Sequence, residues 1–218
     1  MKGKFIALEG GEGVGKSTQI PILAQWLETK GIKVVTANDP GTTELGSLIR
    51  RIVKNTDPRY PDLRPEDELP LFMAAKVMYM REVIQPTLAS GAWMLSDRFN
   101  LSTPVYQGWG KAEWDWDWTK HVLEHASRVL KPCWPDLTLV LDAPAQLGLS
   151  RRGTEKGDGT RIEDKGLEFH NCINEAFRNM PTMLGHLGPI KLIDATAPKM
   201  AVAGSIKRAV EKHLAFPA

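Results

Sequence analysis

The chain has 218 residues, of which 42% are hydrophobic and 25% charged, so it has enough apolar side chains to bury a sizeable core. Lys and Arg number 28 against 26 Asp and Glu, and a net charge of +2 disfavours nucleic-acid binding through a broad basic surface. The 2 cysteines cannot form a disulfide framework, and no apolar run approaches the roughly 18 residues that cross a membrane. We therefore expect a single cytoplasmic domain over 1–218 that binds neither nucleic acid nor a membrane.

Short apolar strands alternate with amphipathic helices along the sequence. Apolar strands of this kind are typical of parallel strands that are buried on both faces. The alternation predicts an α/β fold, with one parallel sheet and helices on both of its faces. In chain order the prediction is a strand over 4–8, a helix over 17–29, a strand over 33–36, helices over 44–54 and 66–89, a strand over 93–97, a loop over 98–111, a helix over 113–130, a strand over 137–142, a short helix, a helix over 163–184, a strand over 190–193 and a helix over 198–214.

A glycine-rich motif follows the first predicted strand. Residues 10–17 satisfy G-x-x-x-x-G-K-[ST] between a strand and a helix, which is the context that the phosphate loop (P-loop) motif requires. Its glycines let backbone N–H groups surround phosphate oxygens, and the helix start adds the positive end of its dipole. Lys16 would reach the β- and γ-phosphates, and the Ser17 hydroxyl would ligate Mg²⁺. We expect ATP and Mg²⁺ to bind here, at Gly10, Gly11, Glu12, Gly13, Val14, Gly15, Lys16, Ser17 and Thr18.

Two further pairs of residues suggest phosphate and base recognition. Asp97 and Arg98 end the third predicted strand, at the sheet edge where ligands bind in open α/β folds. Asp97 is a second candidate Mg²⁺ ligand, and Arg98 could bridge two phosphates; a plain surface ion pair is the alternative. Phe72 and Lys76 are four residues apart on one helix face, where a ring can stack on a base and an ammonium can donate to a base carbonyl. The pattern alone favours a core position for Phe72, and the stacking role depends on the family resemblance described next.

Several segments, in order along the chain, resemble the thymidylate kinase family of P-loop kinases. They are 39–41, 45–50, 72–76, 97–98, 101–108, 135–142, 161–163 and 193–196. The segment 102–108 is the most specific, because a generic P-loop protein has no reason to carry it. The resemblance covers nearly the whole chain. It implies a P-loop kinase fold with a five-stranded parallel sheet and a short lid at about 150–162.

The resemblance implies a homodimer that transfers the γ-phosphoryl group of ATP to dTMP, giving dTDP. Arg50 would hold the acceptor phosphate, and Gln107 would pair with the edge of the base. Tyr106 would occupy the place of a ribose 2′-hydroxyl, and Glu12 would contact the 3′-hydroxyl. The implied substrate-binding residues are Glu12, Asp39, Arg50, Phe72, Lys76, Arg98, Ser102, Tyr106 and Gln107.

Arginines of this family follow two patterns, one with a catalytic arginine in the phosphate loop and one with glycine there and arginines in the lid. Gly13 fits the second pattern, as do Arg151, Arg152 and Arg161 in the lid region. The catalytic residues that the resemblance implies are Lys16, Arg98, Arg151 and Arg161.

Some positions depart from the family pattern. Lys76 stands where arginine is usual, and lysine is a point charge without the planar fork of arginine. Asn38, Asp39 and Thr42 replace a common arginine, glutamate and glycine. A kinase for a related or 5-modified pyrimidine deoxynucleotide therefore stays open as an alternative. A non-catalytic nucleotide-binding switch or ATPase subunit is an alternative of another class, although it would need neither Arg50 nor the segment 102–108.

Overall fold

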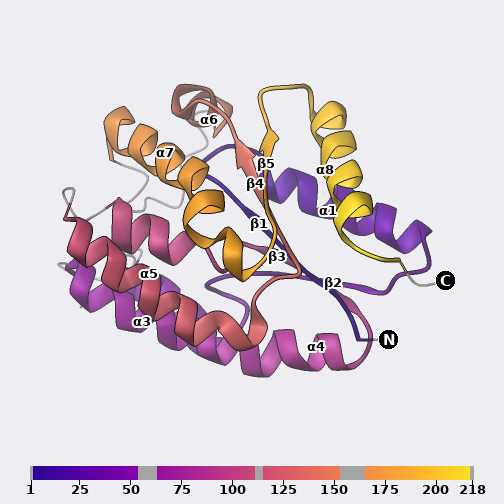
Figure 1. The fold of residues 1–218 in the computed structure, drawn as a ribbon, viewed down its shortest axis with the longest axis horizontal. Helices are drawn as coiled ribbons and strands as arrows, with labels where there is room; N and C mark the ends of the chain where they lie inside the picture. The colour runs from indigo at the N-terminus through magenta and orange to yellow at the C-terminus, as the bar shows by residue number, and fades with distance from the viewer. Residues whose placement is uncertain (1, 54–62, 111–114, 153–164, 217–218) are drawn as a thin grey trace.

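Five parallel strands form one sheet, in the order β2-β3-β1-β4-β5, in the computed structural model, which describes residues 2–53, 63–110, 115–152 and 165–216 (Figure 1). The predicted α/β fold with a five-stranded parallel sheet is confirmed, and every predicted strand lies within two residues of the observed one. The strands are β1 (Phe5–Glu9), β2 (Val34–Asn38), β3 (Trp93–Asp97), β4 (Leu137–Asp142) and β5 (Ile190–Asp194).

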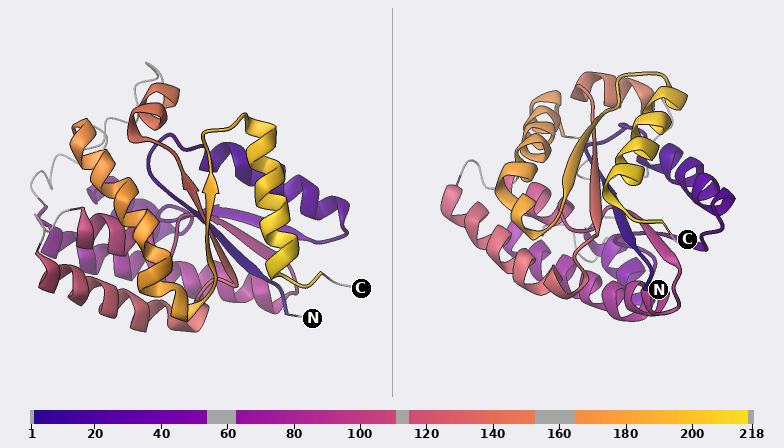
Figure 2. Two further views of the ribbon diagram at one scale, coloured as in Figure 1. Left: turned by 45° about the horizontal axis from the view of Figure 1, so that its top comes forward. Right: turned by 45° about the vertical axis from the view of Figure 1, so that its right-hand side comes forward.

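Helices cover both faces of this sheet, as Figure 2 shows with the sheet seen nearly edge-on. The helices α1 (Lys16–Thr29) and α8 (Lys199–His213) lie side by side on one face, and the helices α3, α4, α5 and α7 cover the other. In these described parts of the chain, no helix combines the length and the apolar character that a membrane span needs. The other α-helices that the structure describes are α2 (Glu44–Val53), α3 (Pro65–Tyr79), α4 (Gln85–Ala89), α5 (Trp116–Leu130), α6 (Ala145–Arg152) and α7 (Leu167–Leu184).

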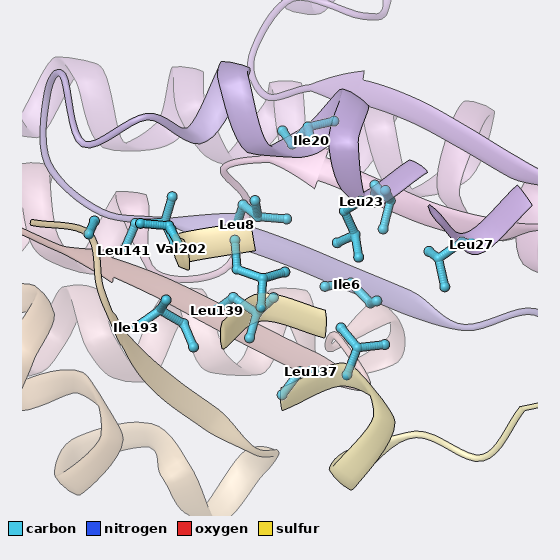
Figure 3. Close-up of a cluster of buried hydrophobic side chains, with 14 of the residues drawn as sticks. Ile6, Leu8, Ile20, Leu23, Leu27, Leu137, Leu139, Leu141, Ile193 and Val202 are labelled. Carbon is cyan, nitrogen blue, oxygen red and sulfur yellow. The ribbon is translucent and has the colours of Figure 1, made fainter. Parts of the chain in front are cut away.

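The apolar strands are buried on both faces because alternate side chains point into different layers. Ile6 and Leu8 of β1 pack toward α1 and α8, in the cluster that Figure 3 shows with Leu23 and Leu139. Phe5 and Ala7 of the same strand belong to the cluster under the helices of the other face. This two-sided burial explains why the strands read as continuous apolar runs.

Two predicted elements are wrong in part. The helix predicted over 66–89 is interrupted by a π-helical segment, Met80–Ile84, between α3 and α4. The loop predicted over 98–111 contains a π-helical turn, Pro104–Trp109, in which the Gly110 amide donates to the Val105 carbonyl at 2.8 Å. This turn is buried, so its backbone groups must bond internally instead of to water.

Two predicted helix starts are also wrong. The helix expected from residue 113 begins at Trp116, because the Asp115 carboxylate caps it by accepting the amides of Asp117 and Trp118. The helix expected from residue 163 begins at Leu167, after Gly166 in an extended conformation.

The sheet topology brings the predicted site residues to one edge. The carboxyl ends of parallel strands meet at the same edge, where ligands bind in such folds. Asp97 at the end of β3 lies opposite Leu8 of β1 and Asn38 of β2 in the strand register. The segments that follow these three strands therefore begin side by side.

Candidate active site

The chain leaves β1 through a phosphate loop whose backbone conformation suits glycine. Gly13 and Gly15 have φ values of 67° and 98°, in the left-handed region. A Cβ atom on Gly13 would overlap the carbonyl oxygen of Gly148 in α6. The loop is therefore packed backbone to backbone against α6, and an arginine cannot occupy position 13 unless α6 shifts. This gives a physical reason for the glycine that the sequence shows at this position.

Lys16 lies buried inside this loop. Its Nζ donates to the carbonyl oxygens of Gly10 at 3.1 Å and Gly11 at 2.7 Å. Burial, followed by repulsion from Arg98, lowers the pKa of Lys16 to about 8. An incoming phosphate would add negative charge beside this ammonium, whose hydrogen bonds to Gly10 and Gly11 end on backbone carbonyl oxygens. The side chain of Val14 belongs to the core, so that residue can offer a ligand only its backbone.

Arg98 follows β3 with a φ of 69°, and its guanidinium joins two loops of the site. Its Nη2 donates to Glu12 Oε1 at 2.6 Å and to the Tyr106 hydroxyl at 3.2 Å. Its Nη1 donates to the Gly10 carbonyl at 3.0 Å and to Ser102 Oγ at 3.2 Å. The Tyr106 hydroxyl in turn donates to Glu12 Oε1 at 3.2 Å. Five predicted site residues from three segments are thus brought together.

Glu9 is a residue of this site that the sequence analysis missed. It is fully buried at the end of β1, and its Oε1 accepts the amide N–H groups of Phe99, Leu101 and Ser102 at 2.8, 2.9 and 3.2 Å. Its Oε2 accepts the Ser102 hydroxyl at 2.6 Å. Glu9 thereby holds the segment that carries Arg98 and Ser102. A carboxylate in an otherwise apolar strand was the available signal, because a buried charge requires partners.

Lys76 and Asp39 form a buried ion pair, each side chain being only 2% exposed. The Lys76 ammonium donates to Asp39 Oδ2 and to the carbonyl oxygen of Phe99. Burial raises the pKa of the Asp39 carboxyl, and the charge of Lys76 opposes that shift. The pair joins α3 to the segment after β2. Because an ammonium has three donors, at most one is left for the base carbonyl that the sequence analysis assigned to it.

Glu68, Phe72 and Lys76 follow one another at intervals of four residues and so share one side of α3. At one end of this stripe, Gln107 Nε2 donates to Glu68 Oε2 at 3.3 Å, and both side chains are buried. Phe72 is partly buried against the cluster of Ile49, Val53 and Ala75. The aromatic ring that was predicted to stack on a base therefore lies between two buried polar pairs.

The remaining predicted arginines lie in different places. Arg50 of α2 donates from Nη1 to the Pro40 carbonyl at 3.3 Å, beside the segment that Asp39 ties to α3. Arg151 at the end of α6 donates to the carbonyl oxygens of Ala195 at 2.7 Å and Thr196 at 3.2 Å, so it does not join the group around Arg98. The side chain of Arg152, Arg161 and most of the predicted lid lie outside the described residues.

Comparison with known proteins identifies the family. A family model described as thymidylate kinase matches residues 8–206. The chain belongs to the thymidylate kinase family. The thymidylate kinase of Magnetococcus marinus is 39% identical over 213 residues, which are 97% of this chain and 97% of that protein. That of Methylococcus capsulatus is 38% identical over 215 residues, 98% and 97% of the two chains. That of Carboxydothermus hydrogenoformans is 41% identical over 178 residues, 81% and 83%.

Membership of the thymidylate kinase family confirms the resemblance seen in the sequence and makes the chain an enzyme, a phosphotransferase. The P-loop kinase fold is likewise confirmed. These matches give no support to the two alternatives, a kinase for another pyrimidine deoxynucleotide and a non-catalytic nucleotide-binding switch or ATPase subunit.

Two side chains offer oxygen ligands for the Mg²⁺ ion that kinases of this kind use. Ser17 is exposed in the first turn of α1, directly after Lys16. Asp97 ends β3 and is partly exposed, and its negative charge is felt at Lys16. A hydroxyl and a carboxylate are hard oxygen ligands, which suit Mg²⁺ beside phosphate oxygens. The donor set present therefore fits this ion.

Proposed function

We propose that this chain transfers the γ-phosphoryl group of ATP to dTMP, giving ADP and dTDP. The observation that carries the proposal is the position of Arg98, which donates both to Gly10 of the phosphate loop and to Tyr106 and Ser102 after β3. A guanidinium between a donor loop and an acceptor loop can neutralise charge on a phosphoryl group as it passes between them. Catalysis of this kind is mainly positioning and charge neutralisation.

On the donor side, the loop amides and Lys16 would hold the phosphates of ATP. Ser17 and Asp97 would hold Mg²⁺, which neutralises phosphate charge when bound. Arg151 and Arg161 are proposed as lid arginines, within a lid at about 150–162 of a single domain. Arg151 would have to leave the carbonyl oxygens of Ala195 and Thr196 to reach a phosphate.

On the acceptor side, Arg50 would bind the phosphate of dTMP, and Phe72 and Gln107 would bind its base. Tyr106 would exclude a ribose 2′-hydroxyl, and Glu12 would accept the 3′-hydroxyl. Lys76, held by Asp39, would place positive charge close to the base. No general base is required, because the attacking oxygen belongs to a phosphate that is already ionised.

A homodimer and a cytoplasmic location are part of the same proposal. Leu45 and Leu48 of α2 and Val77 of α3 are exposed apolar side chains on two helices that pack together, as a subunit contact requires. Cys133 and Cys172 are free thiols, which suit a reducing compartment. Light scattering after size-exclusion chromatography would test the dimer, and a monomer at all concentrations would contradict it.

Product analysis tests the reaction. The chain is incubated with ATP, Mg²⁺ and dTMP, and the nucleotides are separated by anion-exchange chromatography. We expect equal amounts of ADP and dTDP, formed only when dTMP is present. ADP without dTDP would indicate an ATPase, and nucleotide binding without any turnover would indicate a switch; either result would contradict the proposal. Arg98→Lys, which keeps the charge and loses the fork, should lower turnover strongly.

A further inference from the structure

We propose that Glu68 is a specificity-determining residue, because it fixes which end of the Gln107 amide faces the base. The site would then accept the edge of thymine and reject that of cytosine. The inference rests on the proposed function in one respect, namely that Gln107 reads the base.

The contact between the two residues is buried and the backbone of Gln107 is held. Glu68 and Gln107 are 1% and 2% exposed, and Gln107 Nε2 lies 3.3 Å from Glu68 Oε2. Gln107 belongs to the π-helical turn Pro104–Trp109, and its carbonyl oxygen accepts a hydrogen bond from Trp118 Nε1 at 2.9 Å. The amide can therefore change its orientation mainly by rotation about its own side-chain bonds.

The Glu68 carboxylate fixes the orientation of the Gln107 side-chain amide. The Oε2 atom of Glu68 accepts a hydrogen bond from Gln107 Nε2, so the amide meets the carboxylate through its NH₂ group. With Nε2 assigned to Glu68, the carbonyl oxygen Oε1 becomes the end that Gln107 can offer to a ligand. Gln107 would then act as an acceptor, although a glutamine alone can act as either donor or acceptor.

An acceptor at this position distinguishes pyrimidines by their N3 atoms. Thymine carries a hydrogen on N3, which Oε1 could accept. Cytosine has a lone pair on N3, so two acceptors would face each other and the contact would be lost. Uracil presents the same edge as thymine, so Glu68 should have no influence on the recognition of the 5-methyl group.

The other polar pair on this side of α3, Lys76 with Asp39, is less free to discriminate between thymine and cytosine. The Lys76 ammonium already donates to Asp39 and to the Phe99 carbonyl. A lysine also only donates, so it can bond the O2 carbonyl oxygen that thymine and cytosine share, and it can separate the two bases only if it faces position 4, where cytosine carries an amino group. The oriented amide of Gln107, which contacts this stripe at Glu68, separates the two bases at N3.

The test compares kcat/KM for dTMP, dUMP and dCMP in the full chain and in Glu68→Gln. A glutamine at 68 can accept or donate, so Gln107 is free to present either end. We expect the dTMP/dCMP ratio to fall about tenfold, roughly the loss of one oriented hydrogen bond, and the dTMP/dUMP ratio to stay the same. An unchanged dTMP/dCMP ratio in Glu68→Gln would overturn the proposal.

Three further variants separate the possible failures. Gln107→Leu should lower the same ratio, and adding Glu68→Gln to it should change the ratio no further. If Gln107→Leu lowers the ratio but Glu68→Gln does not, the role of Glu68 is wrong while Gln107 still reads the base. If Gln107→Leu leaves the ratio unchanged, the proposed role of Gln107 is wrong and this inference falls with it. Glu68→Asp, with a shorter carboxylate, should also lower the ratio and serves if Glu68→Gln does not fold.

The matched control is Glu66→Gln, which removes an exposed carboxylate from the same helix turn. It should leave all three values of kcat/KM unchanged. A fall in the dTMP/dCMP ratio in this variant would assign the effect to the charge of the helix start instead of to the contact with Gln107, and would overturn the proposal.

Discussion

The proposed donor and acceptor sides of the site hold their functional groups by different means. On the donor side the main chain does so: the carbonyl oxygens of Gly10 and Gly11 hold Lys16, and Gly13 packs against the backbone of α6. On the acceptor side, side chains hold one another. Arg98 is paired with Glu12, Lys76 with Asp39 and Gln107 with Glu68.

This difference predicts how each side responds to substitution. A site made of backbone groups depends on its glycines and on one cation, and most other side chains can change. A network of paired charges behaves otherwise, because removing one partner leaves the other buried and uncompensated. Effects on the acceptor side should therefore be non-additive between partners. Lys16 and Arg98 should also couple across the two sides, because both donate to the Gly10 carbonyl oxygen.

The largest effect is expected from breaking the buried pair on the acceptor side. Lys76→Met should lower the free energy of unfolding by about 3–5 kcal/mol, because it leaves the Asp39 carboxylate buried without its cation. Adding Asp39→Asn should recover part of that loss. Urea denaturation measures both. Lys4→Met is the control, since the pair of Lys4 with Asp136 is about one-third exposed and should contribute only about 0–1 kcal/mol. Equal losses in Lys76→Met and Lys4→Met would contradict the account.

On the donor side, removal of one side chain should cost a comparable free energy, but in transition-state stabilisation and not in folding. Lys16→Ala should lower kcat by about 10²–10³, or roughly 2.7–4 kcal/mol of transition-state stabilisation, with the thermal unfolding temperature nearly unchanged. Lys33→Ala, at an exposed position, is the control and should keep full turnover. A wild-type kcat in Lys16→Ala would remove this residue from the reaction.

A smaller effect should separate the ring of Tyr106 from its hydroxyl. Tyr106→Ala should lower the preference for dTMP over the ribose form about tenfold, because the ring no longer fills the place of the 2′-hydroxyl. Tyr106→Phe keeps the ring and loses the bond to Glu12, so it should retain the preference even if kcat falls. The ratio of kcat/KM for the two sugars is the measurement. The same ratio in all three proteins would exclude Tyr106 from the sugar site.

The smallest expected effect concerns the proton on Lys16. Burial lowers the pKa of Lys16 to about 8 in the free protein, and bound phosphates should raise it again. Above pH 8 more than half of the free side chains have lost the proton, whereas the bound ones keep it, so ATP binding should take up a fraction of a proton and weaken as pH rises. Calorimetry at pH 8.5, in two buffers of different ionisation enthalpy, measures the uptake. Lys16→Met should lack it, and no uptake in the unmodified chain would contradict the assigned pKa shift.

The difference between the two sides also explains which parts of the site could be predicted from the sequence. The phosphate loop could be predicted because consecutive residues carry it, from the end of β1 into α1. The acceptor pairs join residues far apart: Asp39 and Lys76 are 37 positions apart, and Glu68 and Gln107 are 39. No periodicity encodes such a contact. The resemblance supplied Phe72, Lys76 and Gln107, but neither it nor the sequence pattern indicated Glu68.

Burial of polar groups explains the largest errors. The segment after Arg98 is predicted as a loop because it is rich in small and polar residues, yet most of it is buried and part of it forms a π-helical turn. Glu9 makes that possible by accepting three of its backbone amides from the end of β1. A sequence pattern shows which residues are polar, but not which of them find a buried partner.

A panel of acceptor nucleotides tests the central claim most directly, namely that the acceptor side is built for a pyrimidine deoxynucleotide with an N3–H group. kcat/KM is measured at saturating ATP and Mg²⁺ for dTMP, dUMP, dCMP, dGMP and the ribose form of dTMP. The account predicts the highest value for dTMP, a measurable value for dUMP, and much lower values for dCMP, dGMP and the ribose form. A value for dCMP or dGMP equal to that for dTMP, or no transfer to any of the five, would contradict it.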